Sequence, residues 1–171
     1  GSDLILGKMR RRYKTKLYLE KINNISKKIK NVCIGADVIV GFPGETDKEF
    51  NKTLDFIRKL NLSYLHVFSY SERENTQAIN LDGKVSKQVK SLRSKQLRIL
   101  SKKLQRKFYE KNLNGSFKVL FENHNKDGMM FGFTENYIKV KTKYNHEICQ
   151  TIKNVSLCNI ENDGLMTAKF I

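Results

Sequence analysis

The order of helix-like and strand-like segments in the first half of the chain is the feature that most constrains its fold. Apolar residues recur every three or four positions over residues 15–29, and a largely apolar strand pattern follows at residues 33–40. A second helical pattern, 46–60, and a second strand pattern, 64–68, repeat this order. Because strands joined through a helix are typically parallel, we predict an α/β fold with parallel strands.

The turn between the first strand and the second helix contains two glycines and the only proline of the chain, in the segment Gly41–Gly44. Thr46 and Glu49 form a capping-box pattern, in which Thr46 accepts a hydrogen bond from the Glu49 amide and Glu49 reaches back. Ligands of open α/β sheets bind at the strand ends that such turns follow. A tight structural turn without a ligand is an equally good interpretation of this segment by itself.

Positive charge is concentrated in one predicted helix. The chain has 33 Lys and Arg against 17 Asp and Glu, a net charge of +16. Residues 85–111 carry ten basic side chains and one acidic one, a difference of nine, beside a rough apolar stripe. Such a segment predicts contacts with an anionic partner, most often nucleic acid, whose phosphates are bound without reading sequence. The apolar stripe consists of Val89, Leu92, Ile99, Leu100, Leu104 and Phe108. The predicted phosphate contacts are Lys87, Lys90, Arg93, Lys95, Arg98, Lys102, Arg106 and Lys107.

The remaining residues, 112–171, change to short strand-like runs separated by turns that contain Asp-Gly pairs. The runs are 117–122, 137–143, 147–152 and 166–171. About five short strands in a segment of this length predict a small closed or partly open β-barrel, a design often used to bind nucleic acid. Phe131, Phe133 and Tyr137 are candidates for stacking on RNA bases, and packing in the barrel core is an equally good alternative.

Residues with metal-binding or catalytic chemistry are few and scattered. Cys33, Cys149 and Cys158 lack the spacing of a disulfide framework or of a metal site, so we expect reduced, buried thiols. His66 lies in an apolar run and is interpreted first as a core histidine, and Asp37 is expected to point into the structure. The residues alone therefore predict no complete active site and no metal site.

The sequence also bears on the cellular compartment. No apolar run approaches the roughly 20 residues needed to cross a bilayer, and no signal-peptide pattern is present. We expect a soluble cytoplasmic protein that does not interact with membranes.

Four segments, in order, resemble the radical S-adenosylmethionine methylthiotransferases. GSDLILGKMRRRY, at Gly1–Tyr13, resembles the stretch after the fourth barrel strand of those enzymes. DVIVGFPGET, at Asp37–Thr46, resembles their fifth strand and its turn, and HVFSYSER, at His66–Arg73, their sixth strand. GFTENYIKV, at Gly132–Val140, is similar to their C-terminal TRAM domain.

This resemblance implies a division of the chain into three parts. Residues 1–84 would be the C-terminal portion of a radical S-adenosylmethionine partial (β/α) barrel, 85–111 a basic linking helix, and 112–171 a TRAM-like, OB-like RNA-binding barrel. A partial barrel leaves strand edges unpaired, so dimerisation of the chain through these edges is also expected.

The resemblance further implies tRNA modification. Val119–Glu122 and Gly132–Tyr137 most resemble the branch acting on N6-threonylcarbamoyladenosine, which implies transfer of a methylthio group to ring position two of that adenine, in the tRNA anticodon stem-loop. The isopentenyladenosine branch and a non-catalytic RNA-binding module are the alternatives.

The same resemblance implies S-adenosylmethionine and two [4Fe-4S] clusters as cofactors. The backbone of Ile39, Val40 and Gly41, and of Val67, Phe68 and Ser69, would flank the adenine of S-adenosylmethionine, and Arg11 would bind its carboxylate. The three cysteines do not match the family's cluster-binding triplet, so we expect no catalysis by this chain alone.

Overall fold

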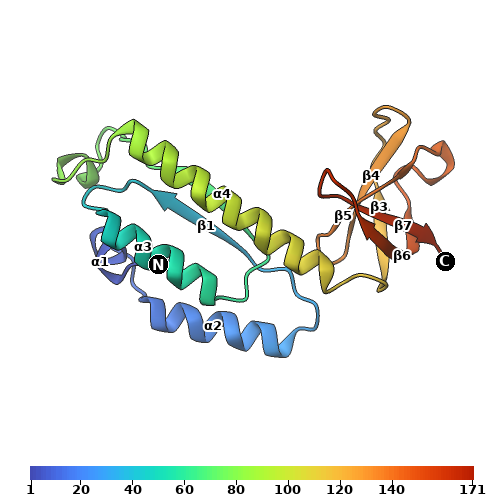
Figure 1. The fold of residues 1–171 in the computed structure, drawn as a ribbon, viewed down its shortest axis with the longest axis horizontal. Helices are drawn as coiled ribbons and strands as arrows, with labels where there is room; N and C mark the ends of the chain where they lie inside the picture. Colours follow the sequence, from blue (N-terminus) through green and yellow to red (C-terminus); the bar gives the residue numbers. More distant parts are fainter. The chain divides into compact units, whose positions relative to one another are not determined.

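The computed structural model describes residues 1–171, which form two compact units, Gly1–Leu104 and Gln105–Ile171. The first unit contains helices and a two-stranded sheet, and the second contains a closed barrel of five strands (Figure 1). The protein is therefore α/β in its first unit and almost entirely β in its second. None of its helices has the length and apolar character needed to cross a membrane.

The first unit alternates helices and strands as the sequence predicts. Its elements are α1 (Asp3–Lys8), α2 (Thr15–Lys28), β1 (Gly35–Val40), α3 (Asp47–Lys59), β2 (Tyr64–Ser69), the short 3₁₀ helix η1 (Gln77–Asn80) and α4 (Lys87–Glu110), whose last turns continue into the second unit. Strands β1 and β2 are parallel, with Gly35 opposite Tyr64 and Val40 opposite Ser69. The predicted parallel pairing is thus confirmed.

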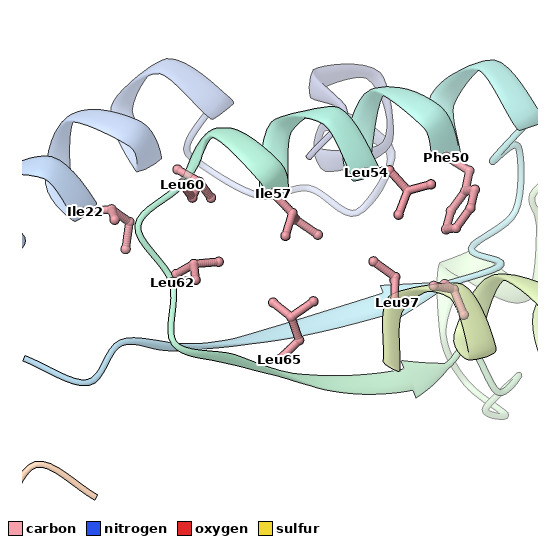
Figure 2. Packing of buried hydrophobic residues seen from close by; sticks show 9 residues of the cluster. Ile22, Phe50, Leu54, Ile57, Leu60, Leu62, Leu65 and Leu97 are labelled. Carbon is pink, nitrogen blue, oxygen red and sulfur yellow. The ribbon is translucent and has the colours of Figure 1, made fainter. Parts of the chain in front are cut away.

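The core of the first unit lies on one face of this sheet. Figure 2 shows side chains of α2, α3, α4 and β2 converging there. The buried cluster consists of Ile22, Val40, Phe50, Leu54, Ile57, Leu60, Leu62, Leu65 and Leu97. Alternate residues of a strand point to opposite faces, and on β1 and β2 the alternate positions Asp37 and His66 are exposed. The prediction that His66 is a core histidine is therefore wrong, and Asp37 lies on the sheet face opposite the core.

Helix α4 covers the outer edge of β2. The hydroxyl of Ser101 accepts a hydrogen bond from the Leu65 amide (2.8 Å) and donates one to the Leu65 carbonyl (3.2 Å). Further along the same edge, the hydroxyls of Ser69 and Ser94 lie 3.0 Å apart. In contrast, β1 pairs with no strand other than β2. The sheet is closed on one side by a helix and has an unpaired strand on the other.

The starts of α3 and α2 are both held by side chains from elsewhere in the unit. Thr46 Oγ1 accepts from the Glu49 amide at 3.4 Å, as the capping box predicts. The Glu49 carboxylate, however, accepts a hydrogen bond from the hydroxyl of Ser2 instead of reaching back to Thr46. At α2, the Thr15 amide donates to Asp3 Oδ1 at 2.8 Å, so a carboxylate of α1 satisfies the first turn of α2.

The second unit is a closed barrel with the strand order β3-β4-β5-β7-β6. Its elements are β3 (Ser116–Phe121), β4 (Met129–Thr134), β5 (Lys139–Lys143), the 3₁₀ helix η2 (His146–Ile148), β6 (Ile152–Ile160) and β7 (Met166–Phe170). The prediction of five short strands in a small barrel is confirmed. One predicted strand, 147–152, is wrong: η2 and a turn occupy it, and β6 begins at Ile152.

Alternation along the strands builds the barrel core. Every second residue of β3 is buried, from Phe117 to Phe121, and the alternate side chains point outward. The fully buried side chains of the barrel are Val119, Phe121, Met130, Ile138, Val140, Val155, Leu157 and Met166. The last turn of α4 packs in this unit, where the hydroxyl of Tyr109 accepts a hydrogen bond from the Lys139 amide at 3.0 Å.

Candidate ligand cavity and nucleic-acid interface

A cavity of about 610 Å³ lies in the first unit, beside β1 and at the ends of both strands. Its walls come from α1, the segment after α1, the start of α2, β1, α3, the end of β2 and the segment that follows β2. Apolar side chains such as Ile5 and Phe56 share the lining with charged groups, among them Asp37, Glu45 and Arg73. A concave site of this size, mostly apolar and with a few polar groups, suits a small organic ligand.

The structure brings four of the seven predicted cofactor residues to this cavity. Arg11, Ile39, Phe68 and Ser69 line it, although they come from three segments separated by at least 25 residues of sequence. Arg11 is exposed, and its guanidinium can bind a carboxylate through two parallel hydrogen bonds. Ile39 and Phe68 are register partners on adjacent strands and offer an apolar edge beside it.

The other three predicted cofactor residues lie outside the cavity lining. Val40 is completely buried in the core, and Val67 packs against the same core. Gly41 is buried in the turn after β1, with φ +74°, a conformation that favours glycine. Its amide donates a hydrogen bond to Glu45 Oε2 at 2.6 Å, so this N–H is satisfied within the protein.

The turn after β1 is held by a buried arginine from α4. Arg93 Nη1 donates to the carbonyl oxygen of Glu45 (2.9 Å) and to Glu45 Oε2 (2.8 Å). Arg93 Nη2 donates to Asp47 Oδ1 at 2.7 Å. The side chains of Arg93 and Glu45 are only 6% and 3% exposed. Arg93 therefore lies inside the first unit, apart from the other predicted phosphate contacts.

Lys90 is also directed toward the protein. It is half-buried, and its Nζ donates to the carbonyl oxygen of Tyr70 at 3.0 Å and lies 5.3 Å from the centre of the Tyr70 ring. The remaining six predicted phosphate contacts are exposed on α4. They are Lys87, Lys95, Arg98, Lys102, Arg106 and Lys107. Helix α4 thus has an inner face that binds the protein and an outer face rich in positive charge.

The inner face of α4 differs from the predicted apolar stripe. Leu97 is completely buried, whereas Leu92 and Ile99 are 58% and 49% exposed. The buried positions Arg93 and Ser94 precede Leu97 at helical spacing, so polar residues occupy half of this face. The predicted orientation of Leu92 and Ile99 is therefore wrong, because polar partners on β2 and on the turn after β1 determine which side of α4 is buried.

Three aromatic residues gather on the outer surface of the barrel. The rings of Phe133 and Tyr137 stack, with centroids 4.9 Å apart and planes inclined by 23°. Lys139 Nζ lies 5.4 Å from the ring centre of Phe131 and 5.6 Å from that of Phe133. Tyr137 is 60% exposed. The core-packing alternative is not realised for Tyr137, and the cluster includes a cation, Lys139, that the sequence analysis did not single out.

Hydrogen bonds hold the loop that presents Tyr137. The hydroxyl of Thr134 donates to Asn136 Oδ1 (2.6 Å) and accepts from the Ile138 amide (2.8 Å). Asn136 Nδ2 in turn donates to Asn112 Oδ1 at 3.2 Å. Tyr137 itself has φ +65°, in the left-handed region. The loop is therefore built around an unusual backbone conformation at its most exposed aromatic residue.

The cysteines form no thiolate set for a metal cluster. Cys33, Cys149 and Cys158 are free and half-buried, and Cys33 lies in a different unit from the other two. Burial raises the pKa of the Cys33 thiol, which disfavours the thiolate form that binds metals. Nowhere in residues 1–171 do three or more His, Cys, Asp or Glu side chains converge as metal ligands would. These residues do not fit an iron–sulfur cluster.

Comparison with characterised proteins points to a single class of enzyme, although no family model matches the chain. The threonylcarbamoyladenosine tRNA methylthiotransferase MtaB of Bacillus subtilis is 34% identical over 161 residues, which is 92% of this chain. The protein of the same name from Aquifex aeolicus is 35% identical over 153 residues, 90% of this chain. The tRNA-2-methylthio-N(6)-dimethylallyladenosine synthase of Syntrophus aciditrophicus is 39% identical over 136 residues, 80% of this chain.

The similarity covers nearly all of this chain but a smaller part of its relatives. The chain spans 36% of the length of the two MtaB proteins and 28% of that of the Syntrophus enzyme. The match extends into both units of the structure, because 92% of 171 residues is longer than either unit alone. We conclude that this chain is an MtaB-like segment: over nearly its whole length it is homologous to about 36% of the length of the tRNA methylthiotransferases named MtaB.

Proposed function

We propose that this chain is the part of a tRNA methylthiotransferase that binds S-adenosylmethionine in its first unit and contacts tRNA through α4 and through the barrel. The observation that carries the proposal is the cavity of about 610 Å³, where Arg11, Ile39 and Ser69 meet from three separate segments. Each of these segments resembles a cofactor-binding segment of radical S-adenosylmethionine enzymes.

The lining of the cavity fits S-adenosylmethionine. Arg11 would bind the carboxylate of its methionine part, and Ile39 and Phe68 would lie against the adenine. Reductive cleavage of bound S-adenosylmethionine supplies the radical that begins methylthio transfer in such enzymes. The residues of this chain would bind and orient that molecule and exclude water from it. The thiols of this chain do not fit the two [4Fe-4S] clusters.

The sheet of the first unit supports assignment to the end of a larger (β/α) barrel. Ser101 covers the outer edge of β2, whereas β1 has a free edge where a further parallel strand can pair. The sheet face opposite the core carries the exposed side chains of Asp37, His66 and Phe68. In a barrel this face would point toward the interior, where substrate is bound.

The second unit and the outer face of α4 support tRNA binding. The exposed cations of α4 would contact phosphates, and Tyr137 with Phe133 would stack on unpaired bases of an anticodon loop. Lys139, beside both Phe131 and Phe133, adds a positive charge next to this stacking surface. The unit would act as a TRAM-like RNA-binding barrel.

We propose N6-threonylcarbamoyladenosine as the substrate nucleoside, because the segments Val119–Glu122 and Gly132–Tyr137 most resemble the branch that acts on it. The Syntrophus relative, at 39% identity, favours the isopentenyladenosine branch as the second candidate. Deleting the gene that encodes this chain and analysing the nucleosides of bulk tRNA by mass spectrometry separates the two. Loss of the methylthio derivative of threonylcarbamoyladenosine supports the proposal, and loss of the isopentenyl derivative alone supports the second candidate. Unchanged levels of both would refute both.

A direct binding experiment tests the assignment of the cavity. S-adenosylhomocysteine, a stable probe with the same adenosyl and carboxylate groups, should bind the chain in isothermal titration calorimetry. Arg11→Gln should weaken this binding about tenfold or more, because it removes a charge-assisted bidentate contact. Arg12→Gln, a neighbouring exposed arginine outside the cavity lining, is the matched control and should leave the affinity unchanged.

A further inference from the structure

A buried arginine on α4 reaches the turn that follows β1. Arg93 is 5% exposed, and its guanidinium lies 5.2 Å from the ring centre of Phe50, on α3. A charged group is seldom buried unless partners compensate for its lost hydration. Two of its nitrogens donate to Glu45 and Asp47, which stand at the end of the turn and at the start of α3. The guanidinium thus joins α4 to the connection between β1 and α3.

Glu45 relays this attachment back to the end of β1. Its Oε2 accepts from both Arg93 Nη1 (2.8 Å) and the amide of Gly41 (2.6 Å). A single carboxylate oxygen therefore bridges the helix and the first residue after β1. Glu45 also lines the cavity, and Gly41 lies only two residues after Ile39, another lining residue. The rim of the cavity is thus held from outside by one side chain of α4.

Two neighbouring residues of α4 hold the same rim. Lys90 Nζ binds the Tyr70 carbonyl, and the Tyr70 amide donates to the Val40 carbonyl at 2.8 Å. The aliphatic part of Lys90 packs on Gly41 so closely that a Cβ at Gly41 would lie 2.3 Å from Lys90 Cγ. Ser94 contacts Ser69, at the end of β2. One turn of α4 therefore contacts the ends of both strands where they meet the cavity.

We infer that Arg93, acting through Glu45, is a positioning residue that fixes the path of the segment Gly41–Glu45 at the rim of the ligand cavity. The identity of the ligand rests on the proposed function, whereas the positioning itself rests only on the contacts above. Because Arg93 is not itself part of the cavity lining and reaches it only through Glu45, its effect on binding is indirect. Without the guanidinium, Glu45 loses its buried partner and the Gly41 amide loses a fixed acceptor.

Four variants and two measurements test this role. Arg93→Gln should raise the hydrogen-exchange rate of the Gly41 amide at least tenfold and weaken S-adenosylhomocysteine binding at least tenfold. Arg93→Lys keeps the charge but cannot reach Glu45 and Asp47 together, so both effects should be intermediate. Glu45→Gln keeps an acceptor for the Gly41 amide, so exchange there should change less than ligand affinity does. The double variant Arg93→Gln/Glu45→Gln should bind S-adenosylhomocysteine no more weakly than Arg93→Gln alone. Both substitutions break the same contact, the ion pair between Arg93 and Glu45.

Arg58→Gln is the matched control, since Arg58 is an exposed arginine of α3 whose ion pair with Asp55 lies at the surface. It should leave both measurements unchanged. A purely structural role for Arg93 predicts a lower melting temperature with unchanged ligand affinity at temperatures where the variant is folded, and that result would overturn the inference. If Arg93→Gln does not fold, unchanged Gly41 exchange and affinity in folded Arg93→Lys would overturn it equally.

The two proposals fail in different ways. A wild-type chain that does not bind S-adenosylhomocysteine would refute the proposed ligand, while exchange at Gly41 in the Arg93 variants would still decide the positioning role. Wild-type binding together with unaltered exchange and affinity in both Arg93 variants would leave the proposed ligand standing and refute the positioning role.

Discussion

The ring of Tyr137 stacks on that of Phe133 at a centroid distance of 4.9 Å, and the stack is presented by a residue in the left-handed backbone region. That conformation costs about 1–2 kcal/mol for a residue other than glycine and is most tolerable for Asn or Asp. Backbone strain of this kind often occurs where a side chain has to face a ligand. Here it directs the more exposed ring of the stack outward, on the same surface as Lys139.

Tyr137→Asn should weaken binding to an anticodon stem-loop RNA about tenfold, because stacking on an aromatic side chain contributes about 1–3 kcal/mol per base. Asparagine tolerates the backbone conformation of this loop, so the barrel should remain folded. Fluorescence anisotropy with a labelled stem-loop measures the affinity. Phe170→Leu, at another exposed aromatic of the barrel, should leave the affinity unchanged. Equal affinities of wild type and Tyr137→Asn would exclude this cluster from the RNA interface.

Replacing Lys95, Arg98 and Lys102 together with Gln should weaken RNA binding and reduce its salt dependence. Each lost phosphate contact lowers the slope of log affinity against log salt by about one. Anisotropy titrations across a salt series measure this slope. The matched control replaces the exposed lysines Lys21, Lys27 and Lys28 of α2 with Gln, which changes the net charge equally. If both triple variants lower the slope to the same extent, overall charge and not the face of α4 governs binding.

Leu97→Ala should destabilise the first unit by about 2–5 kcal/mol, because it leaves a cavity in the buried cluster. Leu92→Ala, on the same helix but 58% exposed, should change stability by less than about 0.5 kcal/mol. Native-state hydrogen exchange of the amides of β1 and β2 reports the stability of the first unit separately from the barrel. Equal effects of the two substitutions would contradict the orientation of α4, in which Leu97 is buried and Leu92 is exposed.

Asp3 should make the attachment of α2 dependent on pH. The Thr15 amide donates to the Asp3 carboxylate and lowers its pKa from the ordinary value of 3.8. A lowered pKa means that this contribution is complete above the ordinary value and is lost as pH falls through the folded-state pKa. Asp3→Ala should therefore destabilise α2 at pH 7, by about 1 kcal/mol as for other lost helix caps, and less below pH 3.8.

Asp3→Asn separates the charge from the hydrogen bond at this position. It retains an acceptor for Thr15, so it should remove the pH dependence while keeping most of the stability at pH 7. An NMR titration of the Asp3 carboxyl measures its pKa directly. An unshifted pKa, or equal pH profiles for wild type and Asp3→Asn, would show that the carboxylate does not cap α2.

Local sequence patterns predicted the helices and strands that depend on residues close together in the chain. The β1 and β2 runs and the parallel order follow from apolar segments that alternate with a helical pattern, and the structure confirms both. The strand pattern of 147–152 failed, because a 3₁₀ turn uses the backbone groups that a strand would have paired. The acceptor at the start of α2, Asp3, is not part of any local pattern, because it lies twelve residues away.

The buried face of α4 shows where sequence periodicity is insufficient. Leu92 and Ile99 fit an apolar stripe as well as Leu97 does, but only Leu97 reaches the core. Arg93 appears in the sequence as one more cation of a basic helix, because nothing nearby reveals that Glu45 will neutralise it. The helix is oriented so that Arg93 neutralises the buried Glu45 and its serines bond to the edge of β2. This requirement outweighs the cost of leaving two apolar side chains exposed.

By itself, the sequence determined the order of the elements, the change from α/β to β-barrel, and the concentration of positive charge between residues 85 and 111. These properties depend on neighbouring residues, and short-range periodicity and composition record them. Only the tertiary structure decided which cations face solvent, which strand edge is closed, and which residues share a cavity. Those properties depend on pairs far apart in the chain, such as Arg93 with Glu45 and Ser101 with Leu65, whose free energy of interaction exists only once the fold brings them together.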